Sequence, residues 1–139
     1  METNLSMDIS KSELLKMLSA YYSEQLTSNV EVKAEVDTEL RGYGMGEYMD
    51  SVVRFYYSKE ENIGQSKVKI TTTLSEEEIK DALDKIVSKL NYTVIDMSLK
   101  KGTRMRGYYT DEHEVAYFDG VKLNIRQKGI NRVLKQGSE

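Results

Sequence analysis

Residues 38–43 read TELRGY, and residues 103–108 repeat this stretch as TRMRGY sixty-five positions later. The similarity extends toward the N-terminus without a gap, so that residues 10–43 align with residues 75–108. Self-similarity at a fixed spacing is typical of a supersecondary unit that is written twice. The alternative is that two helix-strand segments share their apolar spacing by chance. We interpret the chain as a duplicated unit.

Each repeat opens with a pattern that predicts a helix start. Residues 10–13 read SKSE and residues 75–78 read SEEE, and a serine followed three positions later by glutamate is a capping box. The apolar residues that follow recur at helical spacing. They are Leu14, Met17, Leu18, Tyr21 and Tyr22 in the first repeat, and Ile79, Ala82, Leu83, Ile86, Val87 and Leu90 in the second. Two amphipathic helices are therefore predicted.

Strand patterns follow both predicted helices. Residues 30–36 alternate between apolar and charged, which is typical of a strand with one buried face and one solvent-exposed face. The further predicted strands are residues 52–57, 67–71, 92–99, 115–118 and 121–126. The dipeptide Asp119-Gly120 favours a tight hairpin turn between the last two.

These elements predict an α+β fold made of two tandem α-β-β-β units in a pseudo-two-fold domain. We expect an antiparallel sheet of about six strands with two helices on one face, because each unit alone would leave an apolar face half covered. Residues 1–139 should form a single domain, with internal repeats at approximately 10–73 and 75–127. Residues 129–139 are expected to be a tail.

Composition restricts the chemistry that this chain can perform. It contains no cysteine and one histidine, His113, which argues against thiol catalysis, iron-sulfur clusters and cysteine zinc sites. Residues 111–114 read DEHE, but consecutive side chains point in different directions and assemble no catalytic dyad. We therefore expect no enzyme activity, no catalytic residue, no metal site and no cofactor.

The charge of the chain is unevenly distributed. The net charge is −3, and residues 99–139 are basic whereas residues 1–98 are acidic. Attraction between the two parts within one domain and a basic surface for a partner both explain this pattern. Residues 1–8 are polar, unlike a signal peptide, and no apolar run reaches membrane-spanning length. We expect a cytoplasmic protein that does not contact a membrane.

The repeated Arg-Gly-Tyr supplies the candidate binding site. If the apolar residues of each first strand face the helices, alternation places the arginine and tyrosine of both repeats on the uncovered face. A guanidinium beside a phenol ring can stack on another ring or grip a carboxylate or phosphate. The predicted partner-binding residues are Arg41, Tyr43, Tyr48, Arg106, Tyr108 and Tyr109. Alternatively, each pair stacks on itself to cover the sheet, with glycine marking a bulge.

We expect a non-enzymatic binding protein that engages a macromolecule, a protein before a nucleic acid, through the open sheet face and the Arg-Gly-Tyr loops. Small acidic chains without catalytic motifs include inhibitors encoded by phages and mobile elements, such as anti-CRISPR proteins. Two alternatives stay open, namely nucleic-acid binding and binding of a small anionic ligand such as a nucleotide or phosphate between Arg41 and Arg106. An exposed edge strand could also pair two copies of the chain.

Overall fold

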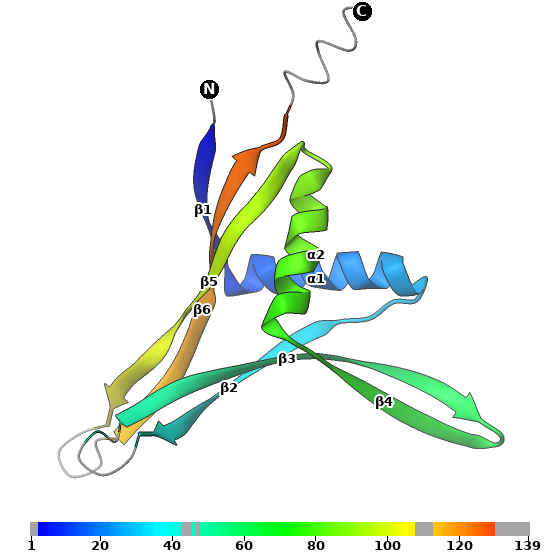
Figure 1. The fold of residues 1–139 in the computed structure, drawn as a ribbon. Coiled ribbons are helices and arrows are strands. Elements are labelled where there is room, and N and C mark those ends of the chain that lie inside the picture. Colours follow the sequence, from blue (N-terminus) through cyan, green and yellow to red (C-terminus); the bar gives the residue numbers. More distant parts are fainter. Residues whose placement is uncertain (1–2, 43–45, 47, 108–112, 130–139) are drawn as a thin grey trace, which may run out of the picture.

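The computed structural model describes residues 3–42, 46, 48–107 and 113–129. These residues form two helices and six strands (Figure 1). In chain order the elements are β1 (Asn4–Ser10), α1 (Lys11–Leu26), β2 (Val32–Arg41), β3 (Tyr48–Ile63), β4 (Ser66–Leu74), α2 (Glu76–Ser88), β5 (Tyr92–Arg106) and β6 (His113–Gln127). All the strand pairs are antiparallel. The predicted α+β class with six antiparallel strands is confirmed.

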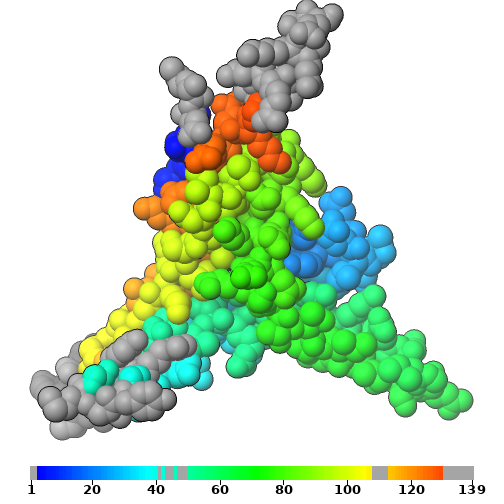
Figure 2. All heavy atoms as spheres, viewed as in Figure 1, coloured from blue at the N-terminus to red at the C-terminus, as the bar shows by residue number. Residues whose placement is uncertain are grey.

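The strands are divided between two three-stranded sheets, where the sequence predicts one. The strand order is β1-β6-β5 in one sheet and β2-β3-β4 in the other. The long strand β3 changes partner along its length, because β2 pairs with its first part and β4 with its second part. Two-stranded arms therefore leave the centre of the molecule in different directions, which gives it a three-cornered outline (Figures 1 and 2).

β1 is a strand that the sequence pattern did not lead us to predict. It pairs with β6 from Asn4, opposite Arg126, to Ser10, opposite Gly120. The first repeat follows the expected order α-β-β-β, as α1-β2-β3-β4, whereas only two strands, β5 and β6, follow α2 in the second. With β1 included, the elements can also be read as β-α-β-β twice, as β1-α1-β2-β3 and β4-α2-β5-β6. The third strand expected in the second repeat does not form, and β1 lies beside β6 in its place.

The predicted hairpin turn at Asp119-Gly120 is wrong. Both residues lie inside β6, which runs from His113 to Gln127. Gly120 has a φ of 123°, and a Cβ added to it would lie 2.0 Å from the carbonyl oxygen of Ile9. Glycine is required here because the end of β1 passes directly over β6, and not because the chain reverses direction.

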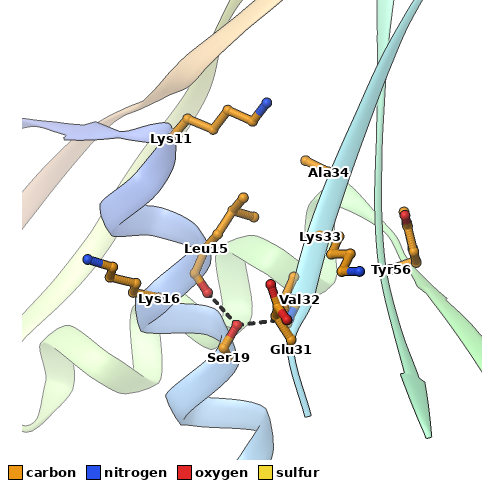
Figure 3. Close-up of a pocket in the computed structure, with 9 residues that line it drawn as sticks. All are labelled: Lys11, Leu15, Lys16, Ser19, Glu31, Val32, Lys33, Ala34 and Tyr56. Carbon is orange, nitrogen blue, oxygen red and sulfur yellow. Dashed lines mark hydrogen bonds between the residues drawn. The ribbon is translucent and has the colours of Figure 1, made fainter.

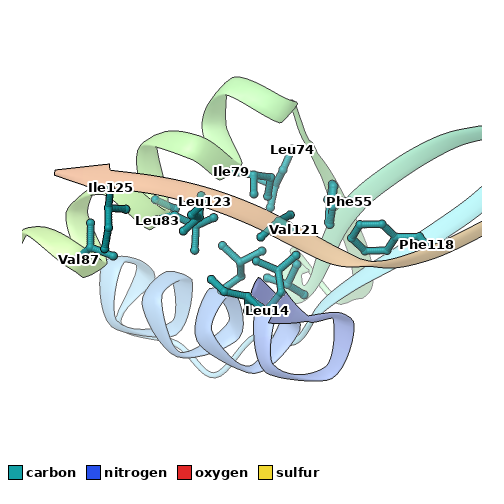
Figure 4. Close-up of a cluster of buried hydrophobic side chains, with 14 residues drawn as sticks. Leu14, Phe55, Leu74, Ile79, Leu83, Val87, Phe118, Val121, Leu123 and Ile125 are labelled. Atoms are coloured by element: carbon teal, nitrogen blue, oxygen red, sulfur yellow. The ribbon is translucent and has the colours of Figure 1, made fainter. Parts of the chain in front are cut away.

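Both predicted helix starts are observed. Ser10 accepts a hydrogen bond from the Glu13 backbone N–H at 3.2 Å, and Ser75 and Glu78 form a complete capping box. Each helix directs its apolar stripe into one shared core (Figure 4). The labelled members of this core are Leu14, Phe55, Leu74, Ile79, Leu83, Val87, Phe118, Val121, Leu123 and Ile125.

Two phenylalanines join the sheets at one end of the core (Figure 4). The rings of Phe55 in β3 and Phe118 in β6 meet edge to face with 5.4 Å between their centroids. Both side chains are almost fully buried. Edge-to-face aromatic pairs stabilise a core by about 0.5–1.5 kcal/mol beyond the burial of their area. This contact therefore holds the inner faces of the two sheets together.

Candidate functional site

The two Arg-Gly pairs occupy equivalent places in the two repeats. Arg41 is the last residue of β2, and Arg106 is the last residue of β5. Gly42 and Gly107 follow with φ values of 92° and 111°. Residues other than glycine rarely adopt positive φ, so the backbone conformation alone explains the repeated glycine. The repeat thus preserves the geometry of a strand end.

The other predicted site residues are described in part. Arg41 lies opposite Tyr48 in β3, and Arg106 lies opposite His113 in β6. The side chain of Arg106 is exposed. Tyr43, Tyr108 and Tyr109, together with the side chains of Arg41 and Tyr48, lie outside the described part of the structure. Their role in partner binding stays a prediction.

Arg41 and Arg106 end strands that belong to two sheets, where the sequence predicts one shared face. In β2 the register continues unbroken from the buried Val32 to Arg41, which falls in the opposite row. In β5 the pairing with β6 shifts register between Leu99 and Lys101. Beyond the shift, Lys101 lies opposite the buried Phe118, and Arg106 falls in the row opposite to that of Lys101. The two arginines therefore do not share one sheet face, because the strands that carry them are in different sheets.

The β2–β3 and β5–β6 hairpins run toward the same corner of the molecule (Figure 1). They are linked on the way by Lys101, whose Nζ donates a hydrogen bond of 2.7 Å to the carbonyl oxygen of Ser51. Leu40 and Met105 lie near the strand ends and are 59% and 57% exposed. These two residues are sixty-five positions apart, and each directly precedes a site arginine. We call residues 40–41 and 105–106 the hairpin corner.

A guanidinium does stack on a phenol ring in the second repeat, but the pair is not the predicted one. Arg104 lies with its Cζ 4.2 Å from the centroid of the Tyr117 ring. The same ring lies across Gly102, where a Cβ would be 2.9 Å from it. An aromatic ring that covers a glycine in a sheet stabilises the sheet surface. Arg104 and Tyr117 thus perform the covering role, and Arg106 is not part of it.

A groove of about 580 Å³ lies between α1 and β2 (Figure 3). Leu15, Val32 and Ala34 supply its apolar surface, and the charged and polar residues that line it are Lys11, Lys16, Ser19, Glu31, Lys33 and Tyr56. β2 is an edge strand, so one side of its backbone is unpaired by any other strand. Sequence reasoning missed this groove because it forms only where α1 and β2 pack together.

Two further hollows lie over β2 and β3. One of about 290 Å³ is lined by Lys33, Tyr56 and Lys69 among others, and one of about 310 Å³ includes Glu35 and Arg54. Limited desolvation and then the Glu35 carboxylate raise the pKa of Tyr56. The Arg54–Glu35 ion pair, at 3.7 Å, has both side chains more than 60% exposed, so it contributes little to stability.

The described residues include no group of three or more acidic or histidine side chains that could hold a metal ion. They also include no helix that is long and apolar enough to cross a membrane. His113 begins β6, whereas Asp111 and Glu112 lie outside the described residues. Comparison with protein-family models, curated proteins and solved structures finds no match to this chain.

Proposed function

We propose that this protein is a non-catalytic binding protein whose partner is another protein, bound at the hairpin corner. The observation that supports the proposal is the exposure of Leu40 and Met105, at 59% and 57%, in equivalent places of the two repeats. Leu90 and Ile63 are more exposed still, at 73% and 62%, so the support comes from the equivalent places beside an arginine and not from exposure alone. Apolar residues beside arginine and tyrosine form the energetic centre of many protein interfaces.

The chemistry of the outward row of β2 narrows the kind of partner. Three successive positions of this row, toward the hairpin corner, are the acidic residues Glu35, Asp37 and Glu39. Arg54 faces Glu35 across the β2–β3 pair. A row of carboxylates complements a basic protein surface and favours encounter with it. In its narrower form, the proposal is that the protein is an inhibitor from a phage or mobile element, such as an anti-CRISPR protein, which occupies a basic channel.

The test is the double substitution Arg41→Ala and Arg106→Ala. The partner is first captured from the source cells and identified by mass spectrometry, and its affinity is then measured with purified proteins. We expect the double variant to bind at least about tenfold more weakly, because arginines at an interface centre commonly contribute more than about 1 kcal/mol each. The thermal midpoint should stay close to that of the unsubstituted chain, because Arg106 is exposed.

The matched control removes two positive charges elsewhere. Lys85 in α2 and Lys122 in β6 are both exposed, so Lys85→Ala with Lys122→Ala changes the net charge equally. Binding that is as tight for the Arg41/Arg106 variant as for this control contradicts the proposal. Capture of nucleic acid in place of protein, with an affinity that falls steeply as salt increases, also contradicts it.

A further inference from the structure

Two serines of α1 act in place of a neighbouring strand at the start of β2. Ser23 Oγ accepts a hydrogen bond from the Val30 N–H and donates one to the Val30 carbonyl, both at 3.0 Å. Ser19 Oγ accepts from the Val32 N–H at 2.8 Å, as Figure 3 shows. Serines four apart on the helix thus meet residues two apart along the extended chain. α1 thereby satisfies the outer edge of β2 as far as the Val32 N–H.

These two serine contacts, which we call the serine ladder, end inside the groove at Ser19 and Val32. The next helix position, four residues earlier, is Leu15, whose side chain can neither donate nor accept a hydrogen bond. The next backbone groups on the edge are those of Ala34, because successive outward groups in an antiparallel strand belong to alternate residues. Within the described residues, the outward N–H and carbonyl of Ala34 have no hydrogen-bond partner. An unpaired strand edge is a template for another strand.

The charges around Ala34 indicate what kind of strand would fit. Lys11 extends from the first turn of α1 over the groove toward Ala34 (Figure 3). Lys33 lines the same groove from β2, and Lys16 lines it from α1. None of these three lysines forms an ion pair with a described residue. Glu31 is the one acidic residue among the described lining, so the groove is positively charged.

We propose that the groove between α1 and β2 binds an extended acidic segment of a partner protein, which adds to the edge of β2 at Ala34. The backbone of the segment would pair with the outward N–H and carbonyl of Ala34. Its carboxylates would reach Lys11 and Lys33, and an apolar side chain between them would pack on Leu15. Strand addition of this kind obtains affinity from main-chain hydrogen bonds and selectivity from the flanking side chains. The site is separate from the hairpin corner and does not depend on it.

The experiment is a selection of random linear peptides of about ten residues, displayed on phage, against the immobilised full-length chain. We expect the enriched peptides to carry aspartate or glutamate at alternate positions, because alternate side chains of an added strand point to the same side. Their affinity should fall at least about tenfold for the double variant Lys11→Glu, Lys33→Glu, in which the lysine attraction becomes repulsion. The control Lys85→Glu, Lys122→Glu makes the same charge change on other exposed positions and should retain affinity.

A second variant tests the backbone pairing. Ala34→Pro removes the outward N–H, and proline is tolerated on edge strands where that N–H faces away from the sheet. We expect it to weaken peptide binding as well, with folding checked by circular dichroism. If it does not fold, the lysine reversal decides the question alone. The Arg41→Ala, Arg106→Ala variant should bind the peptides unchanged, which separates this site from the hairpin corner.

Several results would overturn the inference. They are enrichment of basic or uncharged peptides, failure to enrich any peptide, and acidic peptides that bind the Lys11/Lys33 variant as tightly as the unsubstituted chain. Displacement of the peptides by single-stranded nucleic acid would show that the lysines serve phosphates. A dimer of the chain that Ala34→Pro dissociates would show that a second copy occupies the edge.

Discussion

Gly120 lies where the backbone of residues 9–11 comes close to β6. A Cβ at this position would be 2.0 Å from the Ile9 carbonyl oxygen, 2.8 Å from the Ser10 carbonyl carbon and 2.9 Å from the Lys11 nitrogen. Residues other than glycine also rarely adopt its φ of 123°. Both the space and the conformation therefore require glycine where β1 ends and α1 begins.

Gly120→Ala should lower the free energy of unfolding by about 3 kcal/mol or more, because backbone atoms cannot move aside as a flexible side chain can. Urea unfolding followed by circular dichroism measures this loss. The matched control is Gly46→Ala, where a Cβ would meet no atom within 4 Å. We expect that variant to stay within about 0.5 kcal/mol of the unsubstituted chain. Equal urea midpoints for the two variants would contradict the crowding argument.

The same residue explains why a strong local pattern failed. Asp119-Gly120 between two apolar stretches is a common hairpin signal, because glycine permits positive φ in tight turns. The positive φ at Gly120 is real, but its cause is the approach of residues 9–11, more than a hundred positions earlier in the chain. A local pattern can show that glycine is required and still leave open whether a turn or a close contact requires it.

At the scale of elements, local signals were sufficient for the helices and insufficient for the edge strands. The capping residues Ser10 and Ser75 and the apolar stripes act within a few turns, so both helix starts were predictable. β1 also alternates, with Leu5, Met7 and Ile9 facing the core side. Its pattern is short, and Leu5, Met7 and Ile9 alternate with Asn4, Ser6 and Asp8, so the segment resembled a polar terminus.

The candidate site likewise has one part that local sequence signals indicated and another part that they could not indicate. The repeated Arg-Gly pair marks the ends of β2 and β5, although the strands predicted at 30–36 and 92–99 stop short of Arg41 and Arg106. The groove could not be predicted, because it depends on which strand edge packs beside α1. Ser19 and Ser23 are four positions apart in the helix, and that spacing is visible in the sequence. Its meaning follows only once β2 is known to lie against that face of α1.

Ser23→Ala tests the serine ladder at the scale of one helix-strand contact. The change leaves the N–H and carbonyl of Val30, a residue that is 5% exposed, without the partner they now share. We expect a loss of about 1–3 kcal/mol, which is typical of buried polar groups left unsatisfied. Urea unfolding of Ser12→Ala, an exposed serine of the same helix, provides the control and should show a loss below about 1 kcal/mol. A loss at Ser23 no larger than at Ser12 would contradict the ladder.

At the scale of the whole molecule, the sequence repeat predicted which helices and strands form better than it predicted how the strands are divided between sheets. Alternating apolar residues show that a strand has one buried face, but they do not show which strand pairs with it. β3 pairs with β2 and β4, whereas β6 pairs with β1 and β5, and these pairings divide the strands between two sheets. The contact that unites the sheets, Phe55 against Phe118, joins residues from different repeats.

Tyr22 lies where several parts of the molecule meet. Its ring, on α1, stacks on Tyr57 of β3 with 5.6 Å between centroids, and it meets Tyr21 edge to face at 5.1 Å. Desolvation by burial, and after it the Glu78 carboxylate of α2, raise the pKa of Tyr22 to about 12 from 10.0. The folded protein therefore holds the phenol proton more tightly than the unfolded chain does.

This shift predicts how stability changes at alkaline pH. Between about pH 10 and about pH 12, Tyr22 loses its proton in the unfolded chain but keeps it in the folded protein. The raised pKa of Tyr22 therefore contributes its full stabilisation of the folded state below pH 10, and this stabilisation is lost as the pH rises toward 12. Tyr22→Phe keeps the ring stacked on Tyr57 but removes the ionisable group. Urea midpoints measured from about pH 9 to about pH 12 should fall less steeply for the variant than for the unsubstituted chain. The two proteins differ only at Tyr22, so parallel curves would show that the environment of Tyr22 does not favour its neutral form.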